Sequence, residues 1–373
     1  MQSDSIVYKF YYQWWKNIDK SIFLLISLLF IIGLFFSLVS TSLIASDKLD
    51  TNSYFFFFKH LIYVLIGISL IFIFSSLNSD QLYKYSIFLF FISLISLFLV
   101  PFVGVEVKGS KRWIDLFFLP RFQPIEVLKP FLIIILATIL CDIKSNILFK
   151  YLISIFLISF ISLLLIAQPD IGQTLLVIFC WAVLIFTSGI NIYILLAIFI
   201  AGASLLTYLI IYVPRFDYIQ GRIFSFFNRE TGTHNFQSDK AIESITSGGF
   251  FGKGIGEGVL KNRVPEAHTD YIISVISEEF GVVAIMLILL LFLILIYMVF
   301  KKISFETNDK VKLILIGSIS LILMQATIHI GVNIRLFPTT GMTLPFLSYG
   351  GSSIISTSIL AGIILNLTKR KIT

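Results

Sequence analysis

The sequence predicts an all-α polytopic membrane protein with about ten transmembrane helices, on three observations. Of the 373 residues, 57% are hydrophobic and 13% are charged, and 39 are phenylalanine, a composition unlike that of a soluble globular protein. Ten apolar runs approach or exceed the roughly 20 residues that a helix needs to cross the hydrocarbon core. Short segments of alternating hydrophobicity, which would predict a β-barrel, do not occur.

Each apolar run is predicted to be a helix because lipid offers the backbone no hydrogen-bond partners. The first run is too long for a signal peptide and lacks a small-residue cleavage pattern, so we expect it to be retained. Residues 1–20 carry tyrosine, tryptophan and lysine side chains typical of an interfacial segment, and residues 21–373 are expected to form a single transmembrane domain. The predicted spans are 21–45, 55–77, 84–103, 126–142, 148–167, 171–188, 191–213, 280–300, 311–334 and 345–367.

The distribution of lysine and arginine predicts the orientation of the chain. An even number of spans places both termini on one side, and the lysine residues of the termini and short loops place that side in the cytoplasm. Two basic loops then face outward against this bias, 104–125 and the large periplasmic loop 214–270 between the seventh and eighth spans. Their cations suggest an anionic partner. For 214–270, the tendency of long loops to translocate regardless of charge is an adequate alternative explanation.

A polar, glycine-rich stretch at 247–281 is the strongest candidate for a site of chemistry, because it lies between apolar runs where lipid would leave polar groups unsatisfied. Its glycines permit tight turns and the close approach of a ligand. Pro265 ends the loop, and Thr269 or Asp270 is placed to cap a new helix. Four polar residues would share one face of that helix: Asp270, Ser274, Ser277 and Glu278.

Other polar positions have structural alternatives to a functional role. Glu126 and Lys129 are three residues apart on a predicted helix and can form an ion pair, either as a structural clamp or as a contact to substrate. Asp170 is predicted to cap the sixth span rather than to act in catalysis. His60 is interpreted, with Lys59, as a pair at the level of the lipid headgroups.

The segment 336–353 joins the last two predicted spans and contains two prolines and three glycines. It is predicted to be a broken, re-entrant start of a helix, which is tolerated at membrane depth only where it lines protein or a watery cavity. Its free backbone amides could face an anion, or its Gly and Ser residues could pack helices closely. The only cysteines, Cys141 and Cys180, argue against a disulfide framework or a thiolate metal site. Phosphate-binding P-loops, paired zinc ligands and GxSxG elbows do not occur in the sequence.

These features together resemble the SEDS (shape, elongation, division and sporulation) polytopic glycosyltransferases of bacterial cell-wall synthesis. The resemblance covers nearly the whole chain, and the order of its motifs along ten predicted spans makes it specific. The motifs are Lys111-Arg112-Trp113-Ile114, Gln123-Pro124-Ile125-Glu126 with Lys129, Gln168-Pro169-Asp170-Ile171-Gly172, Gln220-Gly221-Arg222-Ile223, Phe236-Gln237, Gly248-Gly249-Phe250-Phe251-Gly252, His268-Thr269-Asp270-Tyr271 with Glu278-Glu279-Phe280-Gly281, and Pro345-Phe346-Leu347-Ser348-Tyr349-Gly350-Gly351-Ser352-Ser353.

Within the family, two segments resemble the division branch, FtsW, more than the elongation branch, RodA. They are 254–258 and 338–345. Three residues depart from the family pattern: Ile125 stands where a Ser is usual, His329 where an Asn is usual, and Arg335 where a small residue is common. These departures affect the expected local hydrogen bonds and not the resemblance to the family.

The resemblance implies polymerisation of lipid II into glycan strands during septal wall synthesis in cell division. It implies a class B penicillin-binding protein as the transpeptidase partner, other division proteins and membrane lipids as further partners, and the bacterial inner membrane, at the septum, as the location. Nucleic acid is not among the expected partners. The step joins a sugar 4-hydroxyl to an anomeric carbon with inversion and expels a polyprenyl pyrophosphate, which requires a base and cations.

Asp270 is the candidate catalytic base, a role that the resemblance also implies. A divalent cation is compatible with pyrophosphate as leaving group, but the sequence presents no ligand set for one. The candidate substrate-binding residues are Lys111, Arg112, Trp113, Gln123, Glu126, Lys129, Arg222, Gln237, His268, Ser348, Gly350 and Gly351.

Three other functions remain open at this point: a flippase or transporter of the same lipid, the elongation-type polymerase, and a scaffold that binds division proteins. Charged residues near the mouths of helices suit a polymerase and a flippase alike, because both need a hydrophilic path for a headgroup. Polymer made from lipid II by the purified protein separates the enzyme from the transporter and the scaffold.

Overall fold

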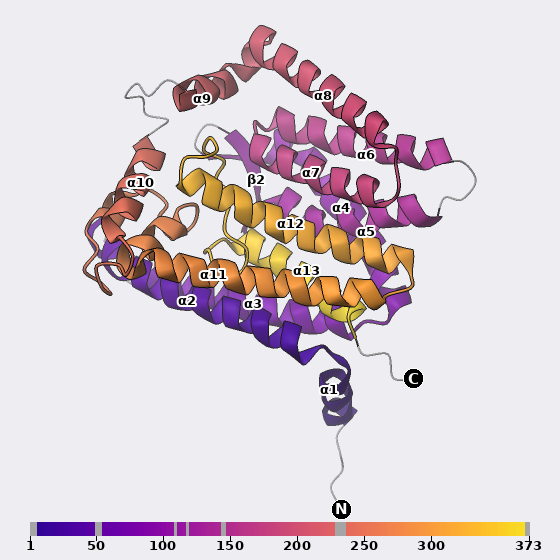
Figure 1. The fold of residues 1–373 in the computed structure, drawn as a ribbon, viewed down its shortest axis with the longest axis horizontal. Helices are drawn as coiled ribbons and strands as arrows, with labels where there is room; N and C mark the ends of the chain where they lie inside the picture. The colour runs from indigo at the N-terminus through magenta and orange to yellow at the C-terminus, as the bar shows by residue number, and fades with distance from the viewer. Residues whose placement is uncertain are drawn as a thin grey trace, which may run out of the picture.

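A computed structural model describes residues 6–48, 54–107, 110–116, 119–142, 147–227 and 236–369, and in these ranges the protein is predominantly helical (Figure 1). Most of the helices run roughly along one axis and pack side by side. The helices are α1 Ile6–Asn17, α2 Lys20–Lys48, α3 Phe55–Ser76, α4 Ser79–Val103, α5 Pro124–Asp142, α6 Ile147–Ala167, α7 Ile171–Thr187, α8 Ile192–Tyr212, α9 Asp217–Phe227, α10 Phe236–Gly248, α11 Ile272–Phe305, α12 Asp309–Asn333 and α13 Gly351–Leu367, with short 3₁₀ turns η1 Pro214–Phe216 and η2 Leu260–Arg263.

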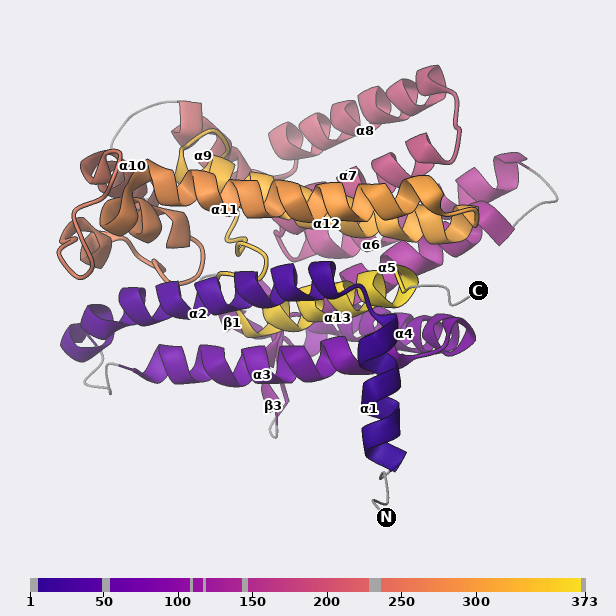
Figure 2. The same ribbon diagram turned by 60° about the horizontal axis from the view of Figure 1, so that its bottom comes forward.

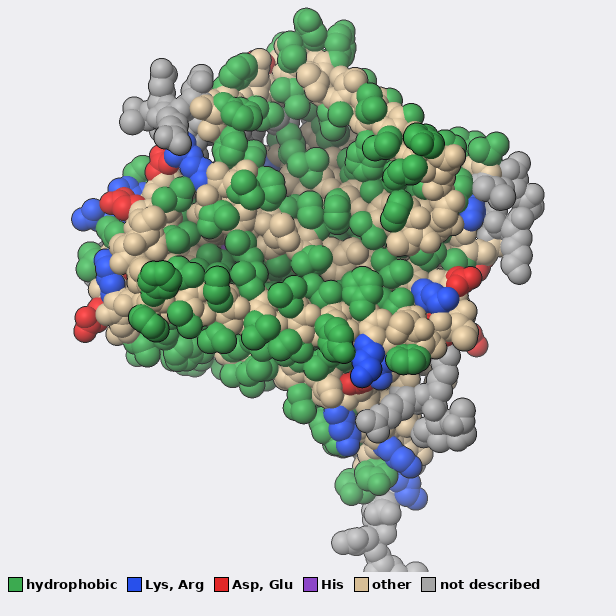
Figure 3. All heavy atoms as spheres, in the orientation of Figure 1, with side chains coloured by type: hydrophobic (Ala, Val, Ile, Leu, Met, Phe, Trp, Pro, Cys, Tyr) green, Lys and Arg blue, Asp and Glu red, His purple; other side chains and the backbone are tan. Residues whose placement is uncertain are grey.

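The predicted class, an all-α polytopic membrane protein, is confirmed. Eight of the described helices are long and apolar enough to cross a membrane, and two shorter apolar helices, α7 and α13, correspond to the remaining predicted spans. Figure 3 shows the matching surface: apolar side chains cover the middle of the face over α11 and α12, whereas charged side chains gather at its two ends. A hydrocarbon layer between two polar layers requires this distribution.

The core is formed by α5, α12 and α13, whose side chains are mostly buried, while α2, α3, α4, α7 and α11 surround them. Figure 2 shows α2, α3, α11 and α13 running alongside one another, with α1 projecting at a steep angle. In α8 only Leu195 is buried, so this helix lies at the periphery (Figure 1). Since apolar side chains are stable against lipid, α8 needs no protein cover.

The segment α1 carries the tyrosines and tryptophans predicted to lie at the membrane interface. Tyr8, Tyr11 and Tyr12 are exposed, whereas the Trp14 ring is buried and its Nε1 donates to Ser75 Oγ at the end of α3, at 2.7 Å. A tryptophan that buries its ring and pairs its N–H is a stable anchor. It fixes α1 to the bundle.

A small antiparallel sheet replaces part of the loop expected at 104–125. Strand β2, Ser110–Leu116, pairs with β1, Val105–Val107, and with β3, Leu119–Phe122. The sheet was missed because its strands are short and rich in charge, and a strand of a few residues shows little alternation. Pairing of the strands satisfies backbone groups that would otherwise lie unpaired at the mouth of α5.

Helix α11 begins at Ile272, directly after the turn where the sequence predicts a new helix, and continues through the predicted span 280–300. It is interrupted at Gly281, whose φ of 76° is non-helical. A Cβ on Gly281 would lie 2.2 Å from the carbonyl oxygen of Phe250. Glycine is therefore required here both by the backbone conformation and by the close approach of the loop.

We expect Gly281→Ala to lower the free energy of unfolding by at least about 1–2 kcal/mol, the typical cost of a left-handed φ at a residue with a Cβ, with the clash against Phe250 added. The matched control is Gly202→Ala in α8, where a Cβ would meet no heavy atom within 4 Å and alanine is the better helix former. Thermal unfolding of both variants in detergent is the measurement. Equal unfolding temperatures would contradict the requirement.

Candidate active site

Asp270 lies in the turn that precedes α11, where backbone contacts from two other elements fix it. Its N–H donates to the carbonyl of Glu266 at 3.1 Å, and its own carbonyl accepts from Asn333 Nδ2, at the end of α12, at 3.0 Å. Its carboxylate points toward Gly341: Oδ2 would lie 3.5 Å from a Cβ on that residue. The residue is partly exposed. The structure therefore holds a carboxylate beside the segment 334–350, at the polar end of the bundle.

The prediction that Thr269 or Asp270 caps α11 is wrong. The N-cap position is occupied by Tyr271, with no side-chain capping hydrogen bond, and Thr269 Oγ1 donates instead to Glu266. Asp270 consequently does not share a helical face with Ser274. Capping of α11 is therefore excluded as the role of this carboxylate.

Two adjacent carboxylates, Glu278 and Glu279, hold the preceding glycine-rich loop against α11. Both are buried; Glu278 accepts from Ser244 Oγ and from Leu260 N–H, each at 2.9 Å, and Glu279 accepts from Gly256 N–H. Carboxylates that accept several hydrogen bonds are stable in a buried position. These two side chains therefore hold the loop and α10 against α11.

The predicted ion pair between Glu126 and Lys129 is confirmed, and it is buried. Lys129 Nζ lies 2.9 Å from Glu126 Oε1 and donates also to Gln325 Oε1 at 3.2 Å. Gln173 Nε2 donates to the same Glu126 oxygen at 2.6 Å, and Gln325 Nε2 donates to the carbonyl of Thr343 at 3.1 Å. The pair thus links α5, α7 and α12 to the segment 334–350.

Arg112 holds the turn between α6 and α7. Its guanidinium donates to the carbonyls of Gln168, at 3.1 Å, and Pro169, and lies 3.9 Å from the Asp170 carboxylate. Asp170 caps α7 by accepting from Gln173 N–H, as predicted, and also accepts from Gln123 Nε2 at 2.9 Å. Burial raises the pKa of the Asp170 carboxyl, and the Arg112 guanidinium opposes that rise.

The remaining predicted substrate-binding residues divide between exposed and structural positions. Lys111 is exposed on β2, and Trp113 and Gln237 are half-buried. Ser348 Oγ accepts from Leu344 N–H at 2.9 Å, which shapes the segment before α13. Arg222 lies in α9, and its side chain is outside the described part of the structure.

The two glycines at the start of α13 are sites of close packing. A Cβ on Gly350 would lie 2.9 Å from Thr343 Cγ2, and one on Gly351 would lie 2.4 Å from Tyr63 Cζ. The segment 334–350 is non-helical, as predicted for a broken helix start, and several of its side chains are buried in protein.

Each departure from the family pattern has a local partner or a packing role. Ile125 is fully buried in the core. His329 Nδ1 lies 2.7 Å from the carbonyl oxygen of Met342, and Arg335, at a φ of 57°, pairs with Asp239 in α10. His329 and Arg335 therefore help to tie α12 to the segment 334–350 and to α10.

The interpretation of His60 as a headgroup-level pair with Lys59 is wrong. Lys59 Nζ lies 4.2 Å from the centroid of the Phe55 ring, whereas the His60 side chain is fully buried, 5.9 Å from the Tyr349 ring. Tyr349 in turn lies 5.9 Å from the ring of His268 and donates its N–H to the His268 carbonyl at 3.1 Å. Sequence reasoning missed His60 because its partners come from distant segments.

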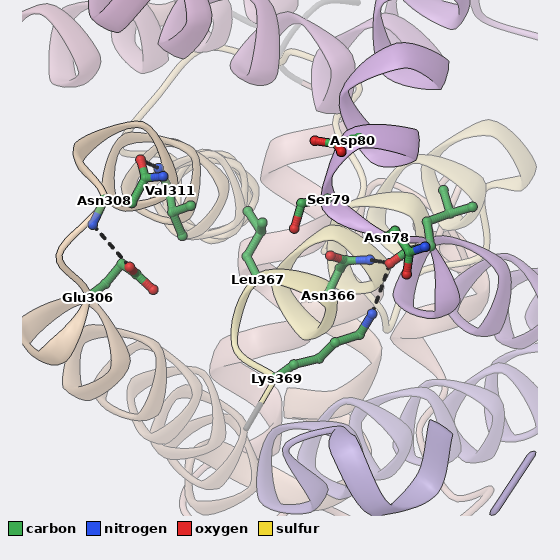
Figure 4. Close-up of a pocket in the computed structure, with 10 residues that line it drawn as sticks. Asn78, Ser79, Asp80, Glu306, Asn308, Val311, Asn366, Leu367 and Lys369 are labelled. Carbon is green, nitrogen blue, oxygen red and sulfur yellow. Dashed lines mark hydrogen bonds between the residues drawn. The ribbon is translucent and has the colours of Figure 1, made fainter. Parts of the chain in front are cut away.

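A cavity of about 550 Å³ lies at the opposite ends of α11, α12 and α13 from Asp270 (Figure 4). Lys369 Nζ and Asn366 Nδ2 both donate to the Leu77 carbonyl there, at 3.0 and 2.7 Å, and Asp80 and Glu306 lie on the rim. Its polar groups include none of the predicted site residues.

In the described part of the chain, no three His, Cys, Asp or Glu side chains are grouped so as to hold a metal ion.

Residues 19–372 match the family of cell cycle proteins that comprises FtsW, RodA and SpoVE. The chain belongs to this family. It is 30% identical to the probable peptidoglycan glycosyltransferase FtsW of Caulobacter vibrioides (strain NA1000 / CB15N) over 96% of this chain and 91% of that protein. It is 35% identical to the protein of the same description from Francisella salina, over 94% of this chain and 89% of that protein.

Solved structures agree with this family assignment. One similar chain belongs to a peptidoglycan synthase complex described for its coordination of polymerization and crosslinking, with a TM-score of 0.77, 26% identity and coverage of 94% of this chain and 97% of that chain. The rod shape determining protein RodA of Thermus thermophilus gives a TM-score of 0.69 at 27% identity, covering 94% of this chain and 96% of that chain. The FtsW/RodA/SpoVE fold and the resemblance to SEDS proteins are thereby confirmed.

The buried pair Glu126–Lys129 should behave as a coupled unit. We expect Glu126→Gln and Lys129→Met each to lower the free energy of unfolding by about 3–5 kcal/mol, because each strands a buried charge, and the double variant to lose less than the sum. Thermal unfolding of the three variants is the measurement. The matched control is the exposed i,i+3 pair Lys240–Glu243, whose removal should leave the unfolding temperature unchanged. Additive losses at Glu126 and Lys129 would show that the two do not couple.

Proposed function

We propose that this protein is a peptidoglycan glycosyltransferase that polymerises lipid II into glycan strands, with Asp270 as its general base. The observation that carries the proposal is the Asp270 carboxylate, which belongs to a half-buried residue and points toward Gly341 in a chain whose relatives are described as probable peptidoglycan glycosyltransferases. Its backbone is positioned by Glu266 and Asn333. Glu278 and Glu279, later in the same region, hold the loop and α10 through hydrogen bonds.

The proposed step is a displacement at the anomeric carbon of a polyprenyl-pyrophosphate-linked disaccharide. The acceptor 4-hydroxyl oxygen attacks that carbon from the face opposite the leaving group while Asp270 takes the hydroxyl proton, and the bond to the pyrophosphate oxygen breaks with inversion. The polyprenyl pyrophosphate leaves with the electron pair, so its negative charge needs cationic partners.

The structure changes which cations we assign to the pyrophosphate. The Arg112 guanidinium donates to two backbone carbonyls, and Lys129 is buried in an ion pair with Glu126. Lys111, exposed on the neighbouring strand β2, and Arg222, in the loop 214–270, are the better candidates. Arg112 then acts through the turn that it holds rather than by touching substrate.

We infer further that the protein lies in the inner membrane with both termini in the cytoplasm and with the loop 214–270 in the periplasm, as the lysine and arginine distribution predicts. The division role, at the septum, is supported by the FtsW descriptions of the relatives. A class B penicillin-binding protein is the proposed partner, supported by the likeness to a chain of a peptidoglycan synthase complex. The flippase alternative is an outcome of the Asp270→Asn experiment below.

Asp270→Asn should abolish polymerisation without unfolding the protein. The amide is close in shape to the carboxylate but cannot take the hydroxyl proton, and loss of a general base typically lowers rates by about 10² to 10⁴. Glycan-strand formation from lipid II by the purified protein with its partner is the measurement, with the unfolding temperature as control. Polymer formed at the wild-type rate by the Asn variant would contradict the assignment of Asp270 as the base. Scrambling of labelled lipid by wild-type protein that makes no polymer would favour the flippase.

Alanine variants of the neighbours Lys111 and Arg112 should show which side chain contacts substrate and which stabilises the fold. We expect Arg112→Ala to lower the unfolding temperature, because the carbonyls of Gln168 and Pro169 lose their donor. Lys111→Ala should keep the wild-type unfolding temperature and raise the KM for lipid II. The reverse pattern, a stable Arg112→Ala with raised KM, would return Arg112 to the pyrophosphate.

A further inference from the structure

Five side chains form an aromatic–histidine cluster beside Asp270: Phe56, His60, Tyr63, His268 and Tyr349. They come from α3, from the turn before α11 and from the segment before α13. The rings of Phe56 and His268 lie 4.5 Å apart, and the Tyr349 ring lies within 6.4 Å of each of the other four. The cluster thus forms a wall next to the candidate base.

His60 is the unusual member of the cluster. Its side chain is fully buried, yet among the described residues neither Nδ1 nor Nε2 has a hydrogen-bond partner. Buried polar groups in native proteins are almost always paired, and an unpaired one typically costs about 1–3 kcal/mol. The His60 ring is joined through Tyr349 to His268, which precedes the candidate base by two residues. Two unpaired nitrogens in one ring at this place therefore call for a functional explanation.

We propose that the aromatic–histidine cluster is a subsite for an uncharged sugar unit of the lipid-linked substrate, with His60 donating one hydrogen bond to it and accepting another. This inference rests on the proposed function and names a part of its substrate. Wide apolar and aromatic walls with a few polar groups are typical of sites for small ligands. In this conformation His60 is fully buried with the half-buried Tyr349 ring 5.9 Å away, so binding requires a neighbouring side chain such as Tyr349 to move.

The donor and acceptor pattern distinguishes a sugar from a pyrophosphate. A neutral imidazole carries one donor and one acceptor. A sugar hydroxyl or acetamido group both donates and accepts and can satisfy the two nitrogens, whereas an ionised phosphate oxygen only accepts and would leave one unpaired. The adjacent cation, Lys59, is directed to the Phe55 ring. The cluster therefore suits an uncharged polar ligand.

The test compares the affinities of His60→Phe and His60→Gln for two lipids, lipid II and the sugar-free undecaprenyl pyrophosphate. Phenylalanine keeps the ring and removes both nitrogens, and glutamine restores a donor and an acceptor. We expect His60→Phe to bind lipid II about tenfold more weakly, the loss typical of one or two neutral hydrogen bonds, and to bind the sugar-free lipid as wild type does. His60→Gln should recover part of the affinity for lipid II.

The matched control is Ser358→Ala, which removes another unpaired buried group in the interface of α3 and α13. Ser358 Oγ faces Gly67, about two helical turns further along α3 from His60. This variant should bind both lipids as wild type does.

Unchanged binding of lipid II by folded His60→Phe, or an equal loss for both lipids, would overturn the sugar subsite. Failure of the proposed function shows separately, as wild-type protein that binds lipid II and forms no polymer in the assay of Asp270→Asn.

Discussion

The site depends on one constraint, that polar groups inside a membrane protein must be paired by the protein itself. In the buried pair of Glu126 and Lys129, one carboxylate oxygen accepts from Lys129 and from Gln173, and Lys129 donates also to Gln325, so the pair connects three helices to the segment before α13. Through Gln325 the network reaches the Thr343 carbonyl. A stretch of backbone without regular structure is thereby tied to the helices at this end of the bundle.

The same constraint positions the loop that carries Asp270. Glu278 and Glu279 accept hydrogen bonds from the glycine-rich loop and its flanks and hold them against α11. A Cβ on Gly248 or Gly252 would lie within 2.2 Å of a backbone oxygen in α11, so only glycine allows that approach. The carboxylates that stabilise the loop and the carboxylate proposed to react are therefore different residues.

A comparison of Arg112 with Asp270 shows that the contacts of a charged side chain indicate its role in the protein. Both were candidates for chemistry on charge alone, but Arg112 donates to the carbonyls of a turn, while the carboxylate of Asp270 lies beside the segment 334–350. A guanidinium has five donors in a fixed fork and readily binds carbonyl groups of the backbone. Charge in a sequence indicates where a site is, and contacts indicate which charged residues hold the structure around it.

The sequence by itself determined the helical membrane fold, the Glu126–Lys129 pair and the Asp170 cap, because hydrophobic length and i,i+3 spacing are local properties. Only the tertiary structure decided the roles of Arg112 and His60, the break in α11 at Gly281 and the small sheet at 105–122. The physical reason is that these depend on partners far apart in the chain. His60 meets Tyr349 and His268 only after α3, α11 and α13 have packed.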